Sequence, residues 1–365
     1  LNTCIIEYRK KVRVLTEDQM FSFKKNMGIG KPEANAFTGE QAFTSAILNI
    51  TGEKPPLLCF TQGHSEPSIK NVRKKGKPGL GVIAAQARIR NMRVMGLNLM
   101  EAGDIPQDCD VLVIVSPRED FNELELRLIK EYIVNRRGSV LAFLDPVIRR
   151  TVGSEKMFFH KNTIETLLEE FGFVLTPAYC LDPGMTAMLG DYTSIIITEF
   201  SEHKAVSGLE GRNLQLSVAR PVRPSEKSRY GYAAESLMFS SSRAWLMDDP
   251  NVREIKARKG GKEKYPLAAA SSRLWRKGKD AESSRLIAAG DSDFITNTYL
   301  TASSRDFFIN SVRWLTEKEK LISIGPEMLG SFRIQLSENN ALTLSVLVWG
   351  LLPLLSILAG TVVWF

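Results

Sequence analysis

The sequence predicts an α/β fold, a mainly parallel sheet with flanking helices, followed by a C-terminal transmembrane helix. From Leu57 onward, short apolar runs alternate with helical patterns, which is typical of a doubly wound sheet. The closing stretch, residues 341–365, contains no charged residue. A run of this length is sufficient to cross a hydrocarbon core of about 30 Å. We therefore expect a charged, water-soluble body that is tethered to a membrane.

The first half of the body follows this alternation element by element. Residues 1–52 are expected to form an N-terminal α/β segment, and an α/β domain is expected over 53–330. A buried parallel strand reads as a continuous apolar run, and an amphipathic helix repeats every 3.6 residues. On these criteria the sequence predicts strands at 57–61, 94–99, 111–116 and 139–145, and helices at 80–91, 122–136 and 163–171. The second helix is expected to bury Leu124, Leu128, Tyr132 and Ile133.

The second half is less regular. An irregular insertion is expected at about 178–284, with loops rich in Ser, Pro, Arg and Lys. Its strand candidates are 194–198, 214–218 and 267–270. Residues 285–290 restore the pattern of a buried strand, and 305–315 that of a helix. A linker at 331–340 then leads to the apolar span 341–365, through which we expect contact with membrane lipid.

Charge and cysteine content narrow the choice of partners. The chain of 365 residues carries a formal charge of +7, with basic clusters at 70–77, 88–93 and 253–264. Such clusters meet nucleic acid, anionic lipid or an acidic partner, or are solvated loops. They lack the interleaved aromatic residues of a strand-binding groove, so no nucleic-acid partner is expected. The four cysteines form no CxxC pair, which indicates neither a metal site nor a disulfide framework.

The loop after the first strand of the α/β domain is the first candidate site. It contains Gly63, His64 and Glu66. If the strand order reverses here, as in flavodoxin-like sheets, this loop faces Ser116 and Arg118 across a crevice that ligands favour in open α/β sheets. Two interpretations stay open. The His and Glu bind a ligand or share a proton, or they form a polar turn that shapes the sheet edge.

A second candidate lies after the strand at 285–290. Asp291 and Asp293 flank Ser292, and paired carboxylates on such a loop hold Mg²⁺ or Ca²⁺ in some proteins. The alternative is an Asp-rich turn whose carboxylates accept backbone N–H groups. No further ligand stands at the EF-hand spacing, so we expect no metal.

The motifs of common enzymes are missing from the sequence. Ser116 is followed by Pro117 and lacks the Gly-x-Ser-x-Gly context of a nucleophile elbow. No GxxxxGK[ST] motif occurs, so the chain is not itself an ATPase of the P-loop class. We therefore expect no catalytic residue and no cofactor.

Several segments resemble a known family in sequence and in order. The segments are FTGEQAFTSAI (37–47), LLCFTQGHSEPSI (57–69), AGDIPQDCDVLVIVSPREDFNELELRLIKEYI (102–133), LAFLDP (141–146), RLIAAGDSDFITN (285–297) and RDFFINSVRWL (305–315). Together with the closing apolar helix, they resemble the GldG-like family, auxiliary components of ABC transporters that are named after a gliding-motility protein. The resemblance covers most of the chain, but not the loop 184–264.

This resemblance implies a domain similar to flavodoxin-like and class I glutamine amidotransferase-like folds. It also implies a non-catalytic subunit of the inner (cytoplasmic) membrane, with an extracytoplasmic body and with an ABC permease and its ATPase as partners. Family members usually carry an N-terminal spanning helix, so we expect one to be missing from this chain. The family often shows GHGE where this chain has Gly63-His64-Ser65-Glu66. The serine makes the turn less permissive.

Our leading hypothesis is a membrane-anchored auxiliary subunit whose body contacts the permease, the substrate or cell-envelope material. The alternative is a domain that binds a glycan or a small anion, or is hydrolytic, at the crevice of Gly63, His64, Glu66 and Ser116.

Overall fold

A computed structural model of the chain describes residues 3–8, 11–16, 20–24, 33–37, 39–40, 42–43, 46–47, 54–73, 75–76, 78–183, 191–252, 255, 263–277, 280–316 and 327–328. The chain divides into a larger unit, Leu1–Met20 with Thr38–Pro326, and a smaller one, Phe21–Phe37 with Glu327–Phe365. No helix within the described ranges is long and apolar enough to cross a membrane. The predicted linker 331–340 and span 341–365 lie outside those ranges.

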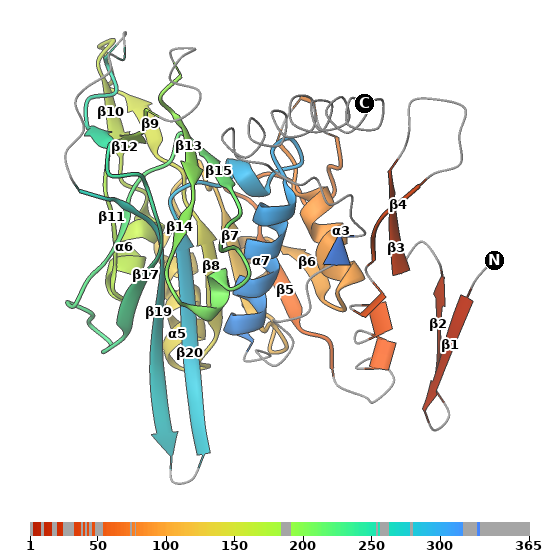
Figure 1. Cartoon of the computed structure of the whole chain (residues 1–365). Coiled ribbons are helices and arrows are strands. Elements are labelled where there is room, and N and C mark those ends of the chain that lie inside the picture. Colours follow the sequence, from red (N-terminus) through yellow and green to blue (C-terminus); the bar gives the residue numbers. More distant parts are fainter. Residues whose placement is uncertain are drawn as a thin grey trace, which may run out of the picture. The chain divides into compact units, whose positions relative to one another are not determined.

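An eight-stranded sheet forms the centre of the larger unit (Figure 1). Its strands, in spatial order, are β14 (Glu199–Phe200), β17 (Ala233–Phe239), β19 (Pro266–Lys277), β20 (Asp280–Ala289), β8 (Ser139–Phe143), β7 (Val111–Val115), β5 (Leu57–Thr61) and β6 (Arg93–Leu97). The five strands from β20 to β6 are parallel, and β19, β17 and β14 pair antiparallel. The expected pairing of 57–61 with 111–116 is confirmed, so the order reverses at β5.

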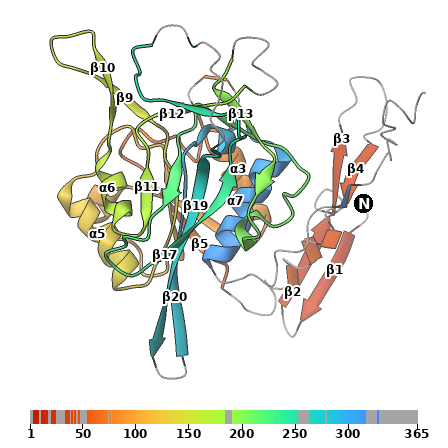
Figure 2. The ribbon, with the colours of Figure 1, turned by 60° about the vertical axis from the view of Figure 1, so that its left-hand side comes forward.

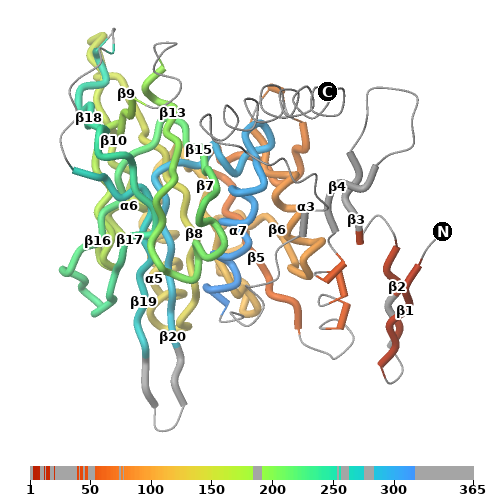
Figure 3. The backbone as a smooth tube through the Cα atoms, in the orientation of Figure 1, coloured from red at the N-terminus to blue at the C-terminus, as the bar shows by residue number. Residues whose placement is uncertain are grey.

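Helices cover both faces of the parallel part. They are α3 (Gly81–Ile89), α4 (Leu99–Ala102), α5 (Glu123–Val134), α6 (Thr163–Glu169) and α7 (Ala302–Leu315), with short 3₁₀ turns η2 (Lys204–Val206) and η3 (Asp293–Ile295). Figures 1 and 3 show α3 and α7, far apart in sequence, side by side on one face. Figure 2 shows α5 and α6 together on the other.

The alternating side chains of each strand feed two separate cores. Phe60 packs in the core on the side of α3 and α7, whereas Cys59 packs in the core on the side of α5 and α6. Because successive strand residues point to opposite faces, a strand that is apolar at every position has to be covered on both. This is why the runs 57–61 and 111–115 are buried throughout.

The buried face of α5 differs from the predicted one. Leu124 is 50% exposed, whereas Glu125 is 1% exposed. The helix buries Glu125, Ile129, Tyr132 and Ile133, so the prediction was right for only its last two residues. A carboxylate replaces an apolar residue here because it has buried partners, which are described below.

The predicted insertion is more ordered than its composition suggests. Short antiparallel pairs fill it and its surroundings: β9 (Val147–Arg150) with β10 (Met157–His160), β11 (Phe173–Leu175) with β16 (Val222–Pro224), β12 (Tyr179–Leu181) with β18 (Trp245–Met247), and β13 (Ser194–Ile197) with β15 (Leu214–Ser217). Only 267–270 of the long strand β19 is apolar enough to be predicted, because its continuation is polar and partly exposed.

Two small sheets complete the described structure. In the larger unit, β1 (Thr3–Tyr8) and β2 (Lys11–Thr16) form an antiparallel hairpin. The smaller unit holds a three-stranded sheet of β3 (Phe21–Lys24), β4 (Glu33–Phe37) and β21 (Glu327–Met328). Segments near the two ends of the chain therefore share one sheet.

Candidate functional site

The candidate site lies at the carboxyl edge of the parallel strands, where the loops after β5, β7, β8 and β20 meet. The backbone N–H of Arg118 donates to the carbonyl of His64 at 2.8 Å, which joins the first two loops. The backbone N–H of Ser292 donates to Oδ1 of Asp145 at 2.6 Å, which joins the last two. The strand reversal at β5 thus places both sequence-predicted candidates on one edge of the sheet.

His64 is the buried link between the loop after β5 and helix α5. Its Nε2 lies 3.1 Å from Oε2 of Glu125, and its ring stacks on Phe121 with 3.9 Å between centroids. On the other side, its Nδ1 lies 3.5 Å from Oε1 of Glu66. The His64 side chain is only 9% exposed, and that of Glu66 is 1% exposed. Both point into the protein, so their contacts are intramolecular.

The surroundings of this pair favour its charged form. Burial acts to lower the pKa of His64, but hydrogen bonds with Glu66 and Glu125 outweigh it and raise the pKa above the usual value. Burial acts to raise the pKa of Glu66, yet the bonds from the imidazole and from backbone N–H groups lower it. The two opposite shifts describe an imidazolium held between carboxylates.

The backbone of these loops takes the left-handed conformation at three positions. Gly63 has φ of 122°, Ser65 of 63° and Ser116 of 48°. A glycine adopts such angles freely, whereas a serine pays a steric cost at Cβ. Ser65 stands at the position where the resembled family often has glycine, and its Oγ donates to Glu119 at 2.7 Å. The expected loss of permissiveness in the turn is therefore visible as positive φ at a non-glycine residue.

Asp145 is the acceptor around which the other loops gather. Its Oδ2 accepts from Oγ of Ser116 at 2.6 Å and from Oγ of Ser292 at 2.9 Å. The guanidinium of Arg118 lies 3.2 Å from the same oxygen, although the Arg118 side chain is 52% exposed. Of the predicted ligand-binding residues, only Arg118 thus presents a largely exposed side chain at this edge.

Asp291 and Asp293 occupy different environments. Both oxygens of Asp291 accept backbone N–H groups, from Ser217 and from Asp293, each at 2.9 Å. Burial, followed by the nearby Asp145, raises the pKa of Asp291 well above its usual value. Burial and Asp145 also raise the pKa of Asp293, to about 6. The contacts of Asp291 are those of an Asp turn, and the described residues contain no group of three ligand side chains suited to a metal ion.

The geometry does not assemble a nucleophilic triad around Ser116. Ser116 shares the positive φ of an elbow nucleophile, which its sequence context did not predict. Its hydroxyl, however, donates to a carboxylate and not to an imidazole. His64, the histidine on the adjoining loop, is bonded to Glu125 instead.

The sequence interpretation missed three residues of the site: Glu125, Asp145 and Ser292. A signal existed for Glu125, since Asn122 and Glu125 have capping-box spacing, and the structure forms both bonds of that box. For Asp145, the signal was its place directly after a buried strand. Ser292 carried no signal beyond its position between two aspartates.

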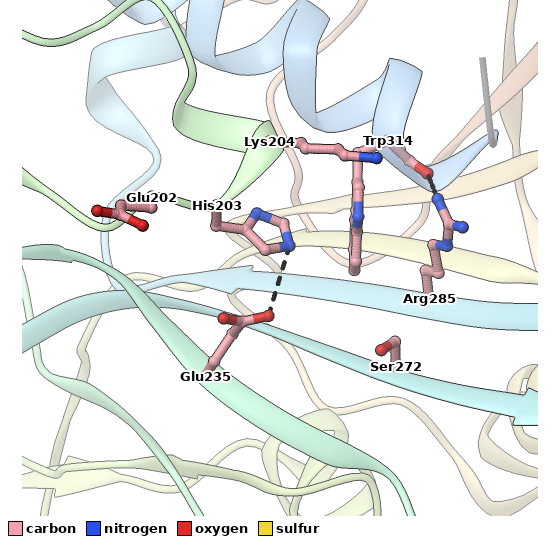
Figure 4. Close-up of a pocket in the computed structure, with 7 residues that line it drawn as sticks. All are labelled: Glu202, His203, Lys204, Glu235, Ser272, Arg285 and Trp314. Atoms are coloured by element: carbon pink, nitrogen blue, oxygen red, sulfur yellow. Dashed lines mark hydrogen bonds and ion pairs between the residues drawn. The ribbon is translucent and has the colours of Figure 1, made fainter. Parts of the chain in front are cut away.

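A separate pocket lies on the face that α7 covers, beside the antiparallel strands (Figure 4). Its volume is about 420 Å³, and it is lined by Glu202, His203, Lys204, Glu235, Ser272, Arg285 and Trp314. Nε2 of His203 lies 3.8 Å from Oε1 of Glu235, and Nη1 of Arg285 donates to the carbonyl of Trp314 at 2.6 Å. The lining therefore contains both acidic and basic groups.

The comparison with known families decides the assignment. A sequence profile of the ABC transport auxiliary family, described as ABC-type uncharacterized transport system, matches residues 55–312. The chain belongs to this family. Membership in the ABC transport auxiliary family supports a role as an accessory component of an ABC-type transport system. It does not single out the GldG-like members or gliding motility. No curated protein matches the chain.

Solved structures give more distant likenesses. The N-terminal domain of mmIFT52 is 15% identical with a TM-score of 0.46, and the match covers 71% of this chain and 97% of that domain. A ThuA-like protein from Bacteroides uniformis is 14% identical with a TM-score of 0.40, covering 74% and 95%. A GMP synthase subunit from Thermoplasma acidophilum is 9% identical with a TM-score of 0.30, covering 73% and 96%. The family assignment rests on the sequence match alone.

Proposed function

We propose that this protein is a non-catalytic, membrane-anchored auxiliary subunit of an ABC transporter, as in the GldG-like group. The observation that carries the proposal is the family match over 55–312. The partners are the permease and its ATPase. The charge-free run 341–365 serves as the anchor in the inner membrane, and the α/β body lies on the extracytoplasmic side.

The site geometry supports a binding role over a catalytic one. Its buried ionisable groups are engaged with one another, as His64 is with Glu125 and Asp291 is with backbone N–H groups. Enzyme sites instead aim such groups at a reacting atom. We assign the carboxyl-edge cluster to fixing the loops of a rigid body that its partners recognise.

Co-purification tests this function. The full chain, tagged and extracted from its native membrane in mild detergent, is expected to bring down a permease and an ATPase. A variant in which an unrelated spanning helix replaces 341–365 separates anchoring from helix packing, because it retains the tether and loses specific contacts. Recovery of neither partner with the intact chain contradicts the subunit role.

The side of the membrane is tested separately by thiol labelling. Val152 is fully exposed, so Val152→Cys in a Cys4→Ser background provides a reactive thiol on the body. An extracytoplasmic body is expected to react with a membrane-impermeant maleimide in intact cells. Reaction only after lysis contradicts that side.

A further inference from the structure

The β19–β20 hairpin reaches beyond the rest of the central sheet at its amino edge. β20 pairs with β8 from Leu286 opposite Val140, and β8 begins one residue earlier. β19 pairs with β17 only as far as Ser272. Residues 274–277 therefore pair with 280–283 alone among the described strands. Figures 1 and 2 show this ribbon projecting past the other strands of the larger unit.

A ribbon of two strands is unusual without a covering layer. An isolated two-stranded hairpin is at best marginally stable in water, and a third strand or a packed helix is normally needed. Leu274, at the base of the ribbon, is 56% exposed. The length of this ribbon is thus not explained by contacts within the described part of the chain, which indicates an external partner.

The composition of the ribbon indicates the chemistry of that partner. Residues 273–279 read RLWRKGK, with four cations and no acid, and Asp280 and Glu282 follow on the returning strand. Tryptophan beside lysine and arginine is typical of segments at a membrane interface. Basic residues at a membrane surface are attracted by anionic headgroups.

The connections of the larger unit lie at the same edge as the ribbon. Helix α7 ends where Oγ of Ser139, the first residue of β8, donates to the carbonyl of Leu315 at 2.9 Å. The chain therefore leaves the described body at the amino edge on its way to the run 341–365. It also enters β5 at Leu57, at this edge. In a chain anchored through 341–365, the amino edge is the side from which the tether departs.

From these observations we infer that the β19–β20 ribbon is a membrane-contact element that lies on anionic phospholipid headgroups. The inference rests on the proposed anchoring through 341–365. Leu274 and Trp275 supply the interfacial apolar groups, and Arg276, Lys277 and Lys279 supply the charge. An acidic face of a protein partner is the competing occupant, and the experiment distinguishes the two.

The test measures the distance of the ribbon from lipid in the full chain. A Cys4→Ser, Leu274→Cys variant is labelled with an environment-sensitive fluorophore and reconstituted in nanodiscs of equal parts phosphatidylglycerol and phosphatidylcholine, without a permease. Cys59, Cys109 and Cys180 are buried and stay unlabelled in the folded protein. Lipids brominated near the headgroup are expected to quench the label several-fold more than in phosphatidylcholine alone.

Val152→Cys is the matched control, because Val152 is also exposed and lies on the hairpin of β9 and β10 that follows the carboxyl edge. Its label is expected to show no lipid quenching. Replacing Arg276, Lys277 and Lys279 by Gln is expected to weaken lipid contact at position 274 by up to roughly fivefold per residue. Labels at 274 and 152 that are quenched equally overturn the inference. Protection of 274 only when a permease is added assigns the ribbon to a protein partner and overturns it as well.

Failure of the anchoring gives a different result. If the full chain is not retained by nanodiscs and does not float with vesicles, the proposed function loses its anchor before the ribbon is tested. If the chain is retained and the label at 274 remains unquenched, only the inference about the ribbon fails.

Discussion

Nε2 of His64 lies 3.1 Å from Oε2 of Glu125, and both side chains are buried. The same Glu125 oxygen accepts the backbone N–H of Asn122 at 3.0 Å, which caps α5. One carboxylate therefore fixes the start of a helix and the loop after β5. This contact explains why a glutamate occupies a position that helical periodicity assigned to the core.

Glu125→Ala is expected to lower the free energy of unfolding by about 3 kcal/mol, because it leaves a buried imidazolium without a partner and removes half of a capping box. Urea unfolding measures the change. Glu123→Ala is the control, since Glu123 is exposed in the first turn of the same helix. Its effect is expected to stay within about 0.5 kcal/mol. Equal effects of the two substitutions contradict a stabilising role for the His64–Glu125 contact.

The stability that His64 contributes depends on pH with a defined sign. Because its pKa is raised in the folded state, the contribution is fully present below the ordinary value of 6.5 and is lost as pH rises through the folded value. For Glu66, whose pKa is lowered, the contribution is present above the ordinary value of 4.5 and is lost as pH falls. Wild type is expected to lose more stability than His64→Gln between pH about 6 and about 9. Parallel pH profiles of the two proteins speak against an imidazolium at this position.

Asp293→Asn is expected to stabilise the protein at neutral pH. Burial and Asp145 raise the pKa of Asp293 to about 6, so the folded state binds more protons than the unfolded state between the ordinary value of 3.8 and 6. Wild-type stability thus falls as pH rises through this window. The substitution removes that loss, with a gain of about 1–3 kcal/mol at pH 7 and little change below pH 4. Thermal unfolding across this range measures it, and a gain that does not vary with pH refutes the electrostatic cause.

Ser65→Gly is expected to relieve the backbone at φ of 63°. Because the substitution also removes the Ser65–Glu119 hydrogen bond, Ser65→Ala serves as the reference, since alanine loses the same bond but keeps Cβ. The glycine variant is expected to be about 1 kcal/mol more stable than the alanine variant. Denaturant midpoints compare them, and an alanine variant that is as stable as the glycine variant is the contrary result.

The sequence by itself determined the parallel core of this protein. The runs 57–61 and 111–116 are apolar at every position, and such strands require cover on both faces, so their burial and their α/β setting follow from local composition. The helices 122–136 and 163–171 were predictable for the same reason, because their 3.6-residue pattern is local. The sequence also placed His64, Glu66, Ser116 and Arg118 at strand ends, which meet once the strand order is known.

Only the tertiary structure decided how these residues are used. The partner of His64 lies 61 positions away in Glu125, and Asp145 accepts bonds from loops that are 29 and 147 positions distant. No local pattern encodes such contacts, since they arise from strand order. The β19–β20 ribbon was missed for a related reason: its strands are held by pairing with each other, and outside 267–270 and 285–290 they lack the apolar run by which a buried strand is predicted.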